Sequence, residues 1–157
     1  WCATRRCGGV LASITRLRKL IEPFAHSLRL KRNSMNKDDR DIYREEILEH
    51  YRHPLNFGTL KKPTHSASST NPLCGDRMSL QIRVDSKGVG REVAFEGSGC
   101  ALSIASASLF TEWMRGKNFR RLTKVKESQI QKLLKTPISP ARLYCALLPY
   151  TALKKLI

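Results

Sequence analysis

The chain has 157 residues, of which 41% are hydrophobic, and this is enough for one globular domain with a hydrophobic core. No run of about 18 consecutive apolar residues occurs, which excludes a membrane-spanning helix and predicts a soluble protein. The net charge of +16 is uneven, because residues 1–34 hold eight basic residues and one acidic residue while residues 35–157 hold 21 and 12. Since the basic residues of 35–157 are interleaved with acidic ones, a basic nucleic-acid-binding or interaction module is only a second alternative for the function.

Residues 1–34 are predicted to lie outside the folded domain, which we expect to span residues 35–157. The chain does not begin with methionine, whereas Met35 is followed by a polar lead-in, so residues 1–34 could lie upstream of the true start. Apolar residues recur at helical spacing over 10–24, with basic residues among them and few acids, which also resembles an organelle targeting segment.

The first half of the domain is predicted to contain one helix followed by strands. Charged and apolar residues at helical spacing predict an amphipathic helix over residues 42–53, which ends before Pro54. The Ser- and Thr-rich residues 64–70 are consistent with a loop or an edge strand. Strict polar and apolar alternation over 78–85 predicts a half-buried strand, which we expect to pair with residues 89–97 as an antiparallel hairpin.

The second half is predicted to be helical. We expect helices over residues 100–115 and 127–134, and a last helix that starts at Ser139 and Pro140. Pro149 would kink this last helix, unless the true helix start lies after it. A short basic segment separates the first two helices. Its cations are most simply solvated, although they could form a docking surface for an acidic partner; they are Arg120, Arg121, Lys124 and Lys126.

Five cysteines, an odd number at wide spacings, do not predict a disulfide framework. Two of them, Cys2 and Cys7, fall in the N-terminal segment and are only a weak metal signal. The other three fall at expected junctions: Cys74 before a strand, Cys100 at a strand-to-helix break, and Cys145 near the start of the last helix. Functional side chains collect at such junctions. A helix N-terminus, where Cys100 is expected, also favours the thiolate form that binds metal and attacks sulfur.

Asp76 adds a carboxylate two residues after Cys74, and Gly75 between them allows a tight turn. Three thiolates and one carboxylate make four ligands, enough for a tetrahedral zinc or for iron with sulfur and oxygen donors. Gly97 and Gly99 would leave room for a metal or cluster to approach the backbone. The spacings of 26 and 45 residues between the three cysteines match no common metal motif, so the residues alone leave simple burial of the thiols open.

Four stretches of the sequence carry a family resemblance. They are YREEILEHYRHPLNFG at 43–58, NPLCGDR at 71–77, EGSGCALSIASASLFTE at 96–112 and ARLYCALLPYTALKKLI at 141–157. Together they resemble the U-type iron–sulfur cluster assembly scaffolds, the family of IscU, SufU and the N-terminal domain of NifU, with motifs closest to SufU. The resemblance implies an α+β fold, a three-stranded antiparallel sheet with helices packed mainly on one face.

The resemblance also implies a function, that of a scaffold rather than an enzyme. Such a protein accepts persulfide sulfur from a cysteine desulfurase, builds a transient [2Fe–2S] cluster from sulfur and iron, and transfers it to acceptor proteins. If the family's ligands are assigned to the matching positions, Cys74, Cys100 and Cys145 would be thiolate ligands and Asp76 the exchangeable fourth ligand. Two chains could also share a cluster as a homodimer. The persulfide acceptor would be Cys145 by analogy with IscU, or Cys74 by analogy with zinc-bound SufU proteins, and both stay open.

The sequence also departs from the two best-known branches. Tyr144 stands where the IscU branch has a histidine that can bind metal, while the segment between Cys100 and Cys145 is too short for the insertion expected of SufU. A zinc-dependent sulfurtransferase that activates a desulfurase is therefore the alternative function. The missing histidine favours the bacterial cytoplasm over an organelle. His50, His53 and His65 are most simply solvated or packed, and of the three only His65, before Cys74, could approach the site.

Overall fold

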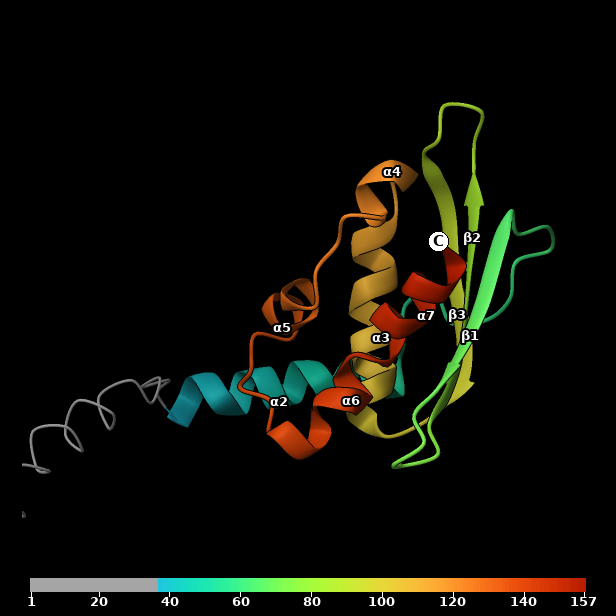
Figure 1. Cartoon of the computed structure of the whole chain (residues 1–157). Coiled ribbons are helices and arrows are strands. Elements are labelled where there is room, and N and C mark those ends of the chain that lie inside the picture. The colour runs from blue at the N-terminus through green and yellow to red at the C-terminus, as the bar shows by residue number, and fades with distance from the viewer. Residues whose placement is uncertain (1–36) are drawn as a thin grey trace, which may run out of the picture. The chain divides into compact units, whose positions relative to one another are not determined.

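The structure is a computed structural model that describes the backbone of residues 37–157 and the side chains of residues 44–157. The expectations for residues 1–34 lie outside the described residues, and a domain that starts at residue 35 stays a prediction. Figure 1 shows a three-stranded sheet with helices gathered on one of its faces. The α+β architecture implied by the resemblance is therefore confirmed.

The sheet is antiparallel throughout, and its strands lie side by side in chain order. They are β1 (His65–Thr70), β2 (Arg77–Val84) and β3 (Gly90–Ser98). The predicted hairpin is confirmed, because β2 and β3 pair with Leu80 opposite Phe95. The Ser- and Thr-rich stretch forms the edge strand β1. Its last residue, Thr70, lies opposite Arg77, so the connection between the two strands spans only residues 71–76.

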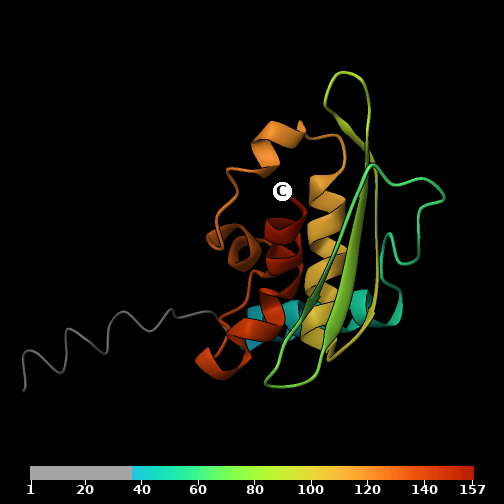
Figure 2. The same cartoon turned by 45° about the vertical axis from the view of Figure 1, so that its right-hand side comes forward.

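The helices account for the rest of the regular structure in the described residues. They are α2 (Lys37–Arg52), α3 (Ala101–Met114), α4 (Phe119–Leu122), α5 (Ser128–Leu134), a 3₁₀ turn (Pro140–Arg142), α6 (Leu143–Ala146) and α7 (Leu148–Leu156). Figures 1 and 2 show α3 and α7 against the sheet, with α5 on the far side of them. Helix α2 packs against α3, which is therefore the central helix of the fold.

Two helices differ from the prediction for local reasons. Helix α2 begins at Lys37 rather than at residue 42, in a stretch of sequence rich in Asp, a residue type that is common in the first turn of helices. Helix α4 lies within the basic segment, where no helix was predicted. Asn118 Oδ1 accepts the backbone N–H of Arg120 at 3.0 Å and so caps this short helix.

The expected last helix is divided into a 3₁₀ turn, α6 with Cys145, and α7. Ser139 precedes the 3₁₀ turn, but its side chain makes no capping hydrogen bond. Helix α7 begins after Leu147, and Pro149 is its second residue. A proline in the first turn of a helix breaks no helical hydrogen bond, because the N–H groups of that turn have no partner within the helix. A new helix therefore starts where the sequence predicts a kink.

The hydrophobic core lies between the inner face of the sheet and helices α3, α5 and α7. On β2, Met78, Leu80 and Ile82 are buried while the residues between them are more exposed, as the alternation predicts. Phe95 of β3 and Phe110 of α3 are fully buried in the same core. Since burial of each large apolar side chain contributes about 1.5–3 kcal/mol, this core holds α3 firmly over the sheet.

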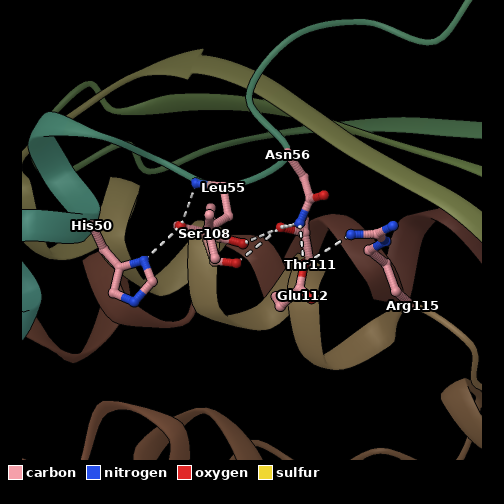
Figure 3. Close-up of polar contacts among 8 residues, drawn as sticks. His50, Leu55, Asn56, Ser108, Thr111, Glu112 and Arg115 are labelled. Carbon is pink, nitrogen blue, oxygen red and sulfur yellow. Dashed lines mark hydrogen bonds and ion pairs between the residues drawn. The ribbon is translucent and has the colours of Figure 1, made fainter.

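Polar contacts tie the segment after α2 to α3, as Figure 3 shows. Ser108 Oγ accepts the backbone N–H of Leu55 at 2.8 Å and pairs with His50 Nδ1 at 2.9 Å. Asn56, with a φ of 59°, donates its Nδ2 to Glu112 Oε2 at 3.0 Å. We call this set the α2–α3 polar cluster; its members are His50, Leu55, Asn56, Ser108, Thr111 and Glu112.

Candidate metal centre

The β1–β2 turn positions Cys74 and Asp76. The backbone N–H of Gly75 donates to the carbonyl of Asn71 at 2.8 Å, and that of Asn71 donates to the carbonyl of Asp76 at 2.8 Å. Gly75 has a φ of 76°, the left-handed region that favours glycine, which confirms the predicted turn. As a result Cys74 is exposed, whereas Asp76 points inward and is only 7% exposed.

Asp76 lies at the N-terminus of α3, next to Cys100. Cys100 is the N-cap residue, but its side chain makes no capping hydrogen bond. Instead, Asp76 Oδ2 accepts the backbone N–H of Cys100 at 3.3 Å and the hydroxyl of Ser103 at 2.6 Å. A carboxylate from the sheet thus takes the place of an N-cap at the positive end of the helix dipole.

The electrostatics of Asp76 follow from these contacts. Burial raises the pKa of the carboxyl group, but the hydrogen bonds from Ser103, from the Cys100 backbone and from the neighbouring thiols outweigh it. The pKa of Asp76 therefore lies below its ordinary value, and the group is ionised at neutral pH. An ionised carboxylate is the form that binds a metal ion.

Gly99 allows Asp76 and α3 to come this close. A Cβ atom at position 99 would lie 2.6 Å from Ser103 Oγ and 2.9 Å from Asp76 Cγ, nearer than real Cβ contacts. The sequence predicts that a metal or cluster approaches the backbone at this glycine. In the structure it is the side chains of Asp76 and Ser103 that occupy the space.

Cys145 reaches the same place from α6. It is 8% exposed, its Sγ lies 3.5 Å from Cys74 Sγ, and Asn71 Nδ2 donates to it at 3.5 Å. Burial, the largest cause, and the nearby Cys74 and Cys100 thiols together raise the pKa of the Cys145 thiol to about 12. Without a metal, Cys145 is therefore a neutral thiol at pH 7.

Three ligand atoms converge at this end of α3. The side-chain donors of Cys74, Asp76 and Cys145 all lie within 4.8 Å of one another. Cys100 is not one of the three, but its Sγ lies 3.4 Å from the hydroxyl of Ser103, which also donates to Asp76. Among residues 44–157 this is the only such group of three or more His, Cys, Asp or Glu side chains. The structure thus brings three of the four predicted residues together and places the fourth beside them.

Sequence reasoning missed two residues of the site. His65 lies in β1 and stacks on Phe119 with 4.5 Å between ring centroids, which confirms the packing interpretation of this histidine. Ser103 and Asn71, which hold Asp76 and contact Cys145, were missed. Ser103 had a signal, because a hydroxyl three residues after Cys100 falls in the first turn of the helix. Asn71 also had a signal in the sequence, because an Asn-Pro pair favours the start of a turn.

Fold and site together define a class of protein: a small α+β domain that presents thiols and a carboxylate at the end of its central helix. Residues 42–157 match the family model for the NifU-like N terminal domain. The chain belongs to this family. No helix in the described part of the chain is long and apolar enough to cross a membrane.

Named relatives agree with this assignment. The iron–sulfur cluster assembly scaffold protein IscU of Haemophilus influenzae is 38% identical over 118 residues, which cover 73% of this chain and 92% of the relative. The mitochondrial iron sulfur cluster assembly protein 1 of Yarrowia lipolytica is 41% identical over 118 residues, which cover 73% of this chain and 64% of the relative. Because bacterial and mitochondrial proteins both match, a bacterial cytoplasmic location stays a prediction.

A solved structure agrees as well. The crystal structure of FiSufU from Fervidobacterium islandicum AW-1 superposes with a TM-score of 0.63 at 25% identity, and the match covers 74% of this chain and 97% of that one. Relatives with IscU and SufU names therefore both match this chain, and its placement nearer to SufU stays a prediction.

Proposed function

We propose that this protein is an iron–sulfur cluster assembly scaffold, which holds iron and sulfur as cargo rather than turning over a substrate. The observation that carries the proposal is the convergence of Cys74, Asp76 and Cys145 within 4.8 Å in a NifU-like domain, with Cys100 beside them. Cys74, Cys100 and Cys145 would bind iron as thiolates, and Asp76 would be the fourth ligand. Thiolate is the usual protein ligand of iron–sulfur clusters.

Asp76 is suited to be a ligand that is easily exchanged. A carboxylate is a harder donor than thiolate and a poorer match for an iron–sulfur cluster. In addition, Asp76 Oδ2 already accepts hydrogen bonds from Ser103 and from the Cys100 backbone, and these compete with a metal for its lone pairs. A scaffold that must give up its cargo benefits from such a ligand.

Sulfur would arrive at Cys74. Of the two acceptor candidates, Cys74 is exposed whereas Cys145 is buried, so an incoming persulfide can reach Cys74 first. Its thiolate attacks the terminal sulfur of the donor persulfide, the sulfur–sulfur bond of the donor breaks, and the donor cysteine leaves as a thiolate. The chemical class of the donor is a cysteine desulfurase.

Cys145 could then receive the same sulfur. Its Sγ lies 3.5 Å from Cys74 Sγ, so the terminal sulfur can pass between them without movement of the backbone. In that step the Cys145 proton moves to the departing Cys74 sulfur, and no oxidant is needed. Because Cys145 is buried and its pKa is raised, it is a poor acceptor for a persulfide from outside, and the sulfur would reach it through Cys74. Both acceptor candidates would thus carry the sulfur, first Cys74 and then Cys145.

The partner would contact the apolar side chains on either side of the thiols. Leu73, next to Cys74, is 74% exposed, and Tyr144, next to Cys145, is 63% exposed. Large exposed apolar side chains around a reactive site are typical of a protein docking surface. We expect the desulfurase and the acceptor proteins to use this surface in turn, and two chains to share it when a cluster is held between them.

A zinc-dependent sulfurtransferase is a second candidate function, because the same donors also suit a single tetrahedral ion. The two candidates differ in what the isolated protein contains. About one tightly held zinc per chain with strong stimulation of a desulfurase supports the zinc carrier; protein without zinc that acquires iron and sulfide supports the scaffold.

The main test is cluster assembly with iron, cysteine and a desulfurase, followed by visible absorption. We expect a coloured product with the parent chain and none with the variant in which Cys74, Cys100 and Cys145 are all alanine. The matched control replaces Cys2 and Cys7 by alanine and should assemble as the parent does. A triple variant that assembles the same cluster would overturn the proposal.

A narrower test addresses Asp76. We expect Asp76→Ala to stay folded and to hold a cluster several times longer than the parent, because the exchangeable ligand is gone. The measurement is the decay of visible absorption in the presence of a chelator. Faster decay would mean that Asp76 is a necessary ligand rather than the point of release.

A further inference from the structure

A basic hollow lies at the C-terminal end of α3, far from the cysteines. It has a volume of about 390 Å³ and is formed by the end of α3, α4, the segment 123–127 and the start of α5. Its lining consists mainly of Trp113, Lys117, Arg121, Lys124, Val125 and Lys126, together with two uncharged polar residues. We call it the basic groove.

The charges of the basic groove are all of one sign. Four of its lining residues are lysine or arginine and none is acidic. Glu127 is adjacent in sequence to Lys126 but does not line the groove. Among the side chains described, residues 44–157, none of these four cations takes part in an ion pair. The positive charge of the groove is therefore not neutralised within the domain.

The floor of the groove is apolar. Trp113 and Val125 are half-buried within it, and Lys117 Nζ lies over the Trp113 ring, 4.6 Å from its centroid. The same indole ring also stacks on Phe110, with 5.7 Å between centroids and 8° between planes. The groove therefore offers cations at its rim and apolar contact below, while its aromatic ring is already engaged by the domain's own side chains.

We propose that the basic groove binds an acidic segment of a partner protein, rich in Asp and Glu with an apolar residue among them. Charge complementarity selects an anionic occupant, and the apolar floor selects a side chain between the acids. A nucleic acid fits less well, because single strands bind along extended basic tracks with aromatic rings free to stack bases. Here the hollow is short, and Trp113 already stacks on Phe110 and carries Lys117 over its ring.

The location of the groove makes it a second docking point. Cys100 and Trp113 are 13 residues apart along α3, a distance of about 20 Å at 1.5 Å per residue. Figure 1 shows α4 at one end of α3 and α6 near the other. A partner held at the groove leaves the thiols open to a second protein. This inference depends on the charge and shape of the groove and not on the proposed function.

The test is binding of a short fluorescein-labelled peptide of glutamate and leucine to the full chain, measured by fluorescence anisotropy at low salt. We expect saturable binding that weakens roughly tenfold in Lys124→Glu/Lys126→Glu, because two attractive charges become repulsive. The control variant, Lys61→Glu/Lys62→Glu, makes the same charge change at two exposed lysines that do not line the groove. We expect it to bind the peptide within about twofold of the parent.

Three results would overturn the proposal. They are no saturable binding, equal weakening in both variants, and tighter binding of an oligothymidylate that is lost in the same groove variant. The first would mean that no acidic segment binds at a defined site, the second would mean general attraction by net charge, and the third would mean a nucleic-acid site. Unchanged far-ultraviolet circular dichroism in both variants shows that the fold is retained, and cluster assembly as in the parent keeps this test separate from the cysteine site.

Discussion

The two halves of α3 bury polar side chains in different ways. At its N-terminus, Ser103 donates to Asp76 and lies 3.4 Å from Cys100 Sγ, while Cys74 Sγ and Cys145 Sγ lie 3.5 Å apart beside them. In its second half, Ser108 and Thr111 bind backbone and side-chain groups from the segment after α2 at 2.8–3.4 Å. Thiols are weak hydrogen-bonding groups, so the side chains at the first half of α3 remain available to bind a metal or a sulfur atom. The polar groups of the second half are already used in hydrogen bonds that stabilise the fold.

The difference separates function from stability on one helix. We expect changes in the α2–α3 polar cluster to lower the free energy of unfolding and leave cluster assembly intact once the protein is folded. Changes around Asp76 should affect both the free energy of unfolding and cluster assembly, because the same carboxylate caps the helix and faces the thiols.

Gly99→Val is expected to lower the free energy of unfolding most, by roughly 2–3 kcal/mol, through overpacking. The added side chain would overlap Ser103 Oγ and Asp76 Cγ and force the β1–β2 turn away from α3. Urea unfolding monitored by circular dichroism gives the free energy, and cluster assembly should fail as well. Ser98→Val, at the exposed neighbouring position, is the control. A Gly99→Val protein as stable as the parent would show that Asp76 and α3 are not closely packed.

Ser108→Ala is expected to cost about 1–3 kcal/mol, because the Leu55 N–H loses its acceptor and His50 loses its partner. Cluster yield per folded chain should stay at the parent level, which distinguishes this half of α3 from the other. The same urea experiment gives the free energy, and Ser86→Ala, in an exposed turn, should change it little. Loss of cluster yield in folded Ser108→Ala would break the proposed division.

Ser103→Ala is expected to cost about 1 kcal/mol, the net contribution of a buried hydrogen bond. It should also raise the pKa of Asp76, since the Ser103 hydroxyl is the largest of the contacts that lower it. Nuclear magnetic resonance titration of the Asp76 carboxyl carbon measures the pKa directly. Ser128→Ala, at an exposed helix start, should move neither quantity. An unchanged Asp76 pKa in Ser103→Ala would mean that the hydrogen bond does not control the carboxylate.

Glu112 should give the smallest effect, and one that depends on pH. The side-chain hydrogen bond from Asn56 lowers its pKa, assisted by Arg115. A lowered pKa stabilises the fold above the unfolded-state value and loses that contribution as pH falls through the folded-state value. Because the side chain is 48% exposed, we expect only a few tenths of a kcal/mol after solvent screening.

The measurement for Glu112 compares urea unfolding of the parent and Glu112→Gln. The variant should be less stable at pH 7, and the difference should vanish near pH 3. Glu96→Gln, at an exposed strand position, should show no such trend. A difference that grows on acidification would contradict the sign of the pKa shift.

The hairpin and the central helix could be predicted because their signals are local. Alternation from Met78 onward places one face of β2 inside, and Gly97-Ser98-Gly99 marks the change from strand to helix. The start of α2 and the short helix α4 were not predicted, since acidic residues near a helix start and a single Asn118 cap give weak local signals. At Pro149 the sequence predicts either a kink or a later helix start, and the structure has a new helix that begins one residue before it.

The family could be identified from the amino-acid sequence alone, through the motifs around three cysteines and an aspartate hinged by Gly75. The same residues predict the donors of the site. How these side chains meet depends on tertiary packing. Cys74 and Cys145 are 71 residues apart in the chain yet 3.5 Å apart in space, while Asp76 is turned toward α3 by Ser103. Residue types fix which atoms can bind, but their distances depend on how the core packs α3 and α6 against the sheet.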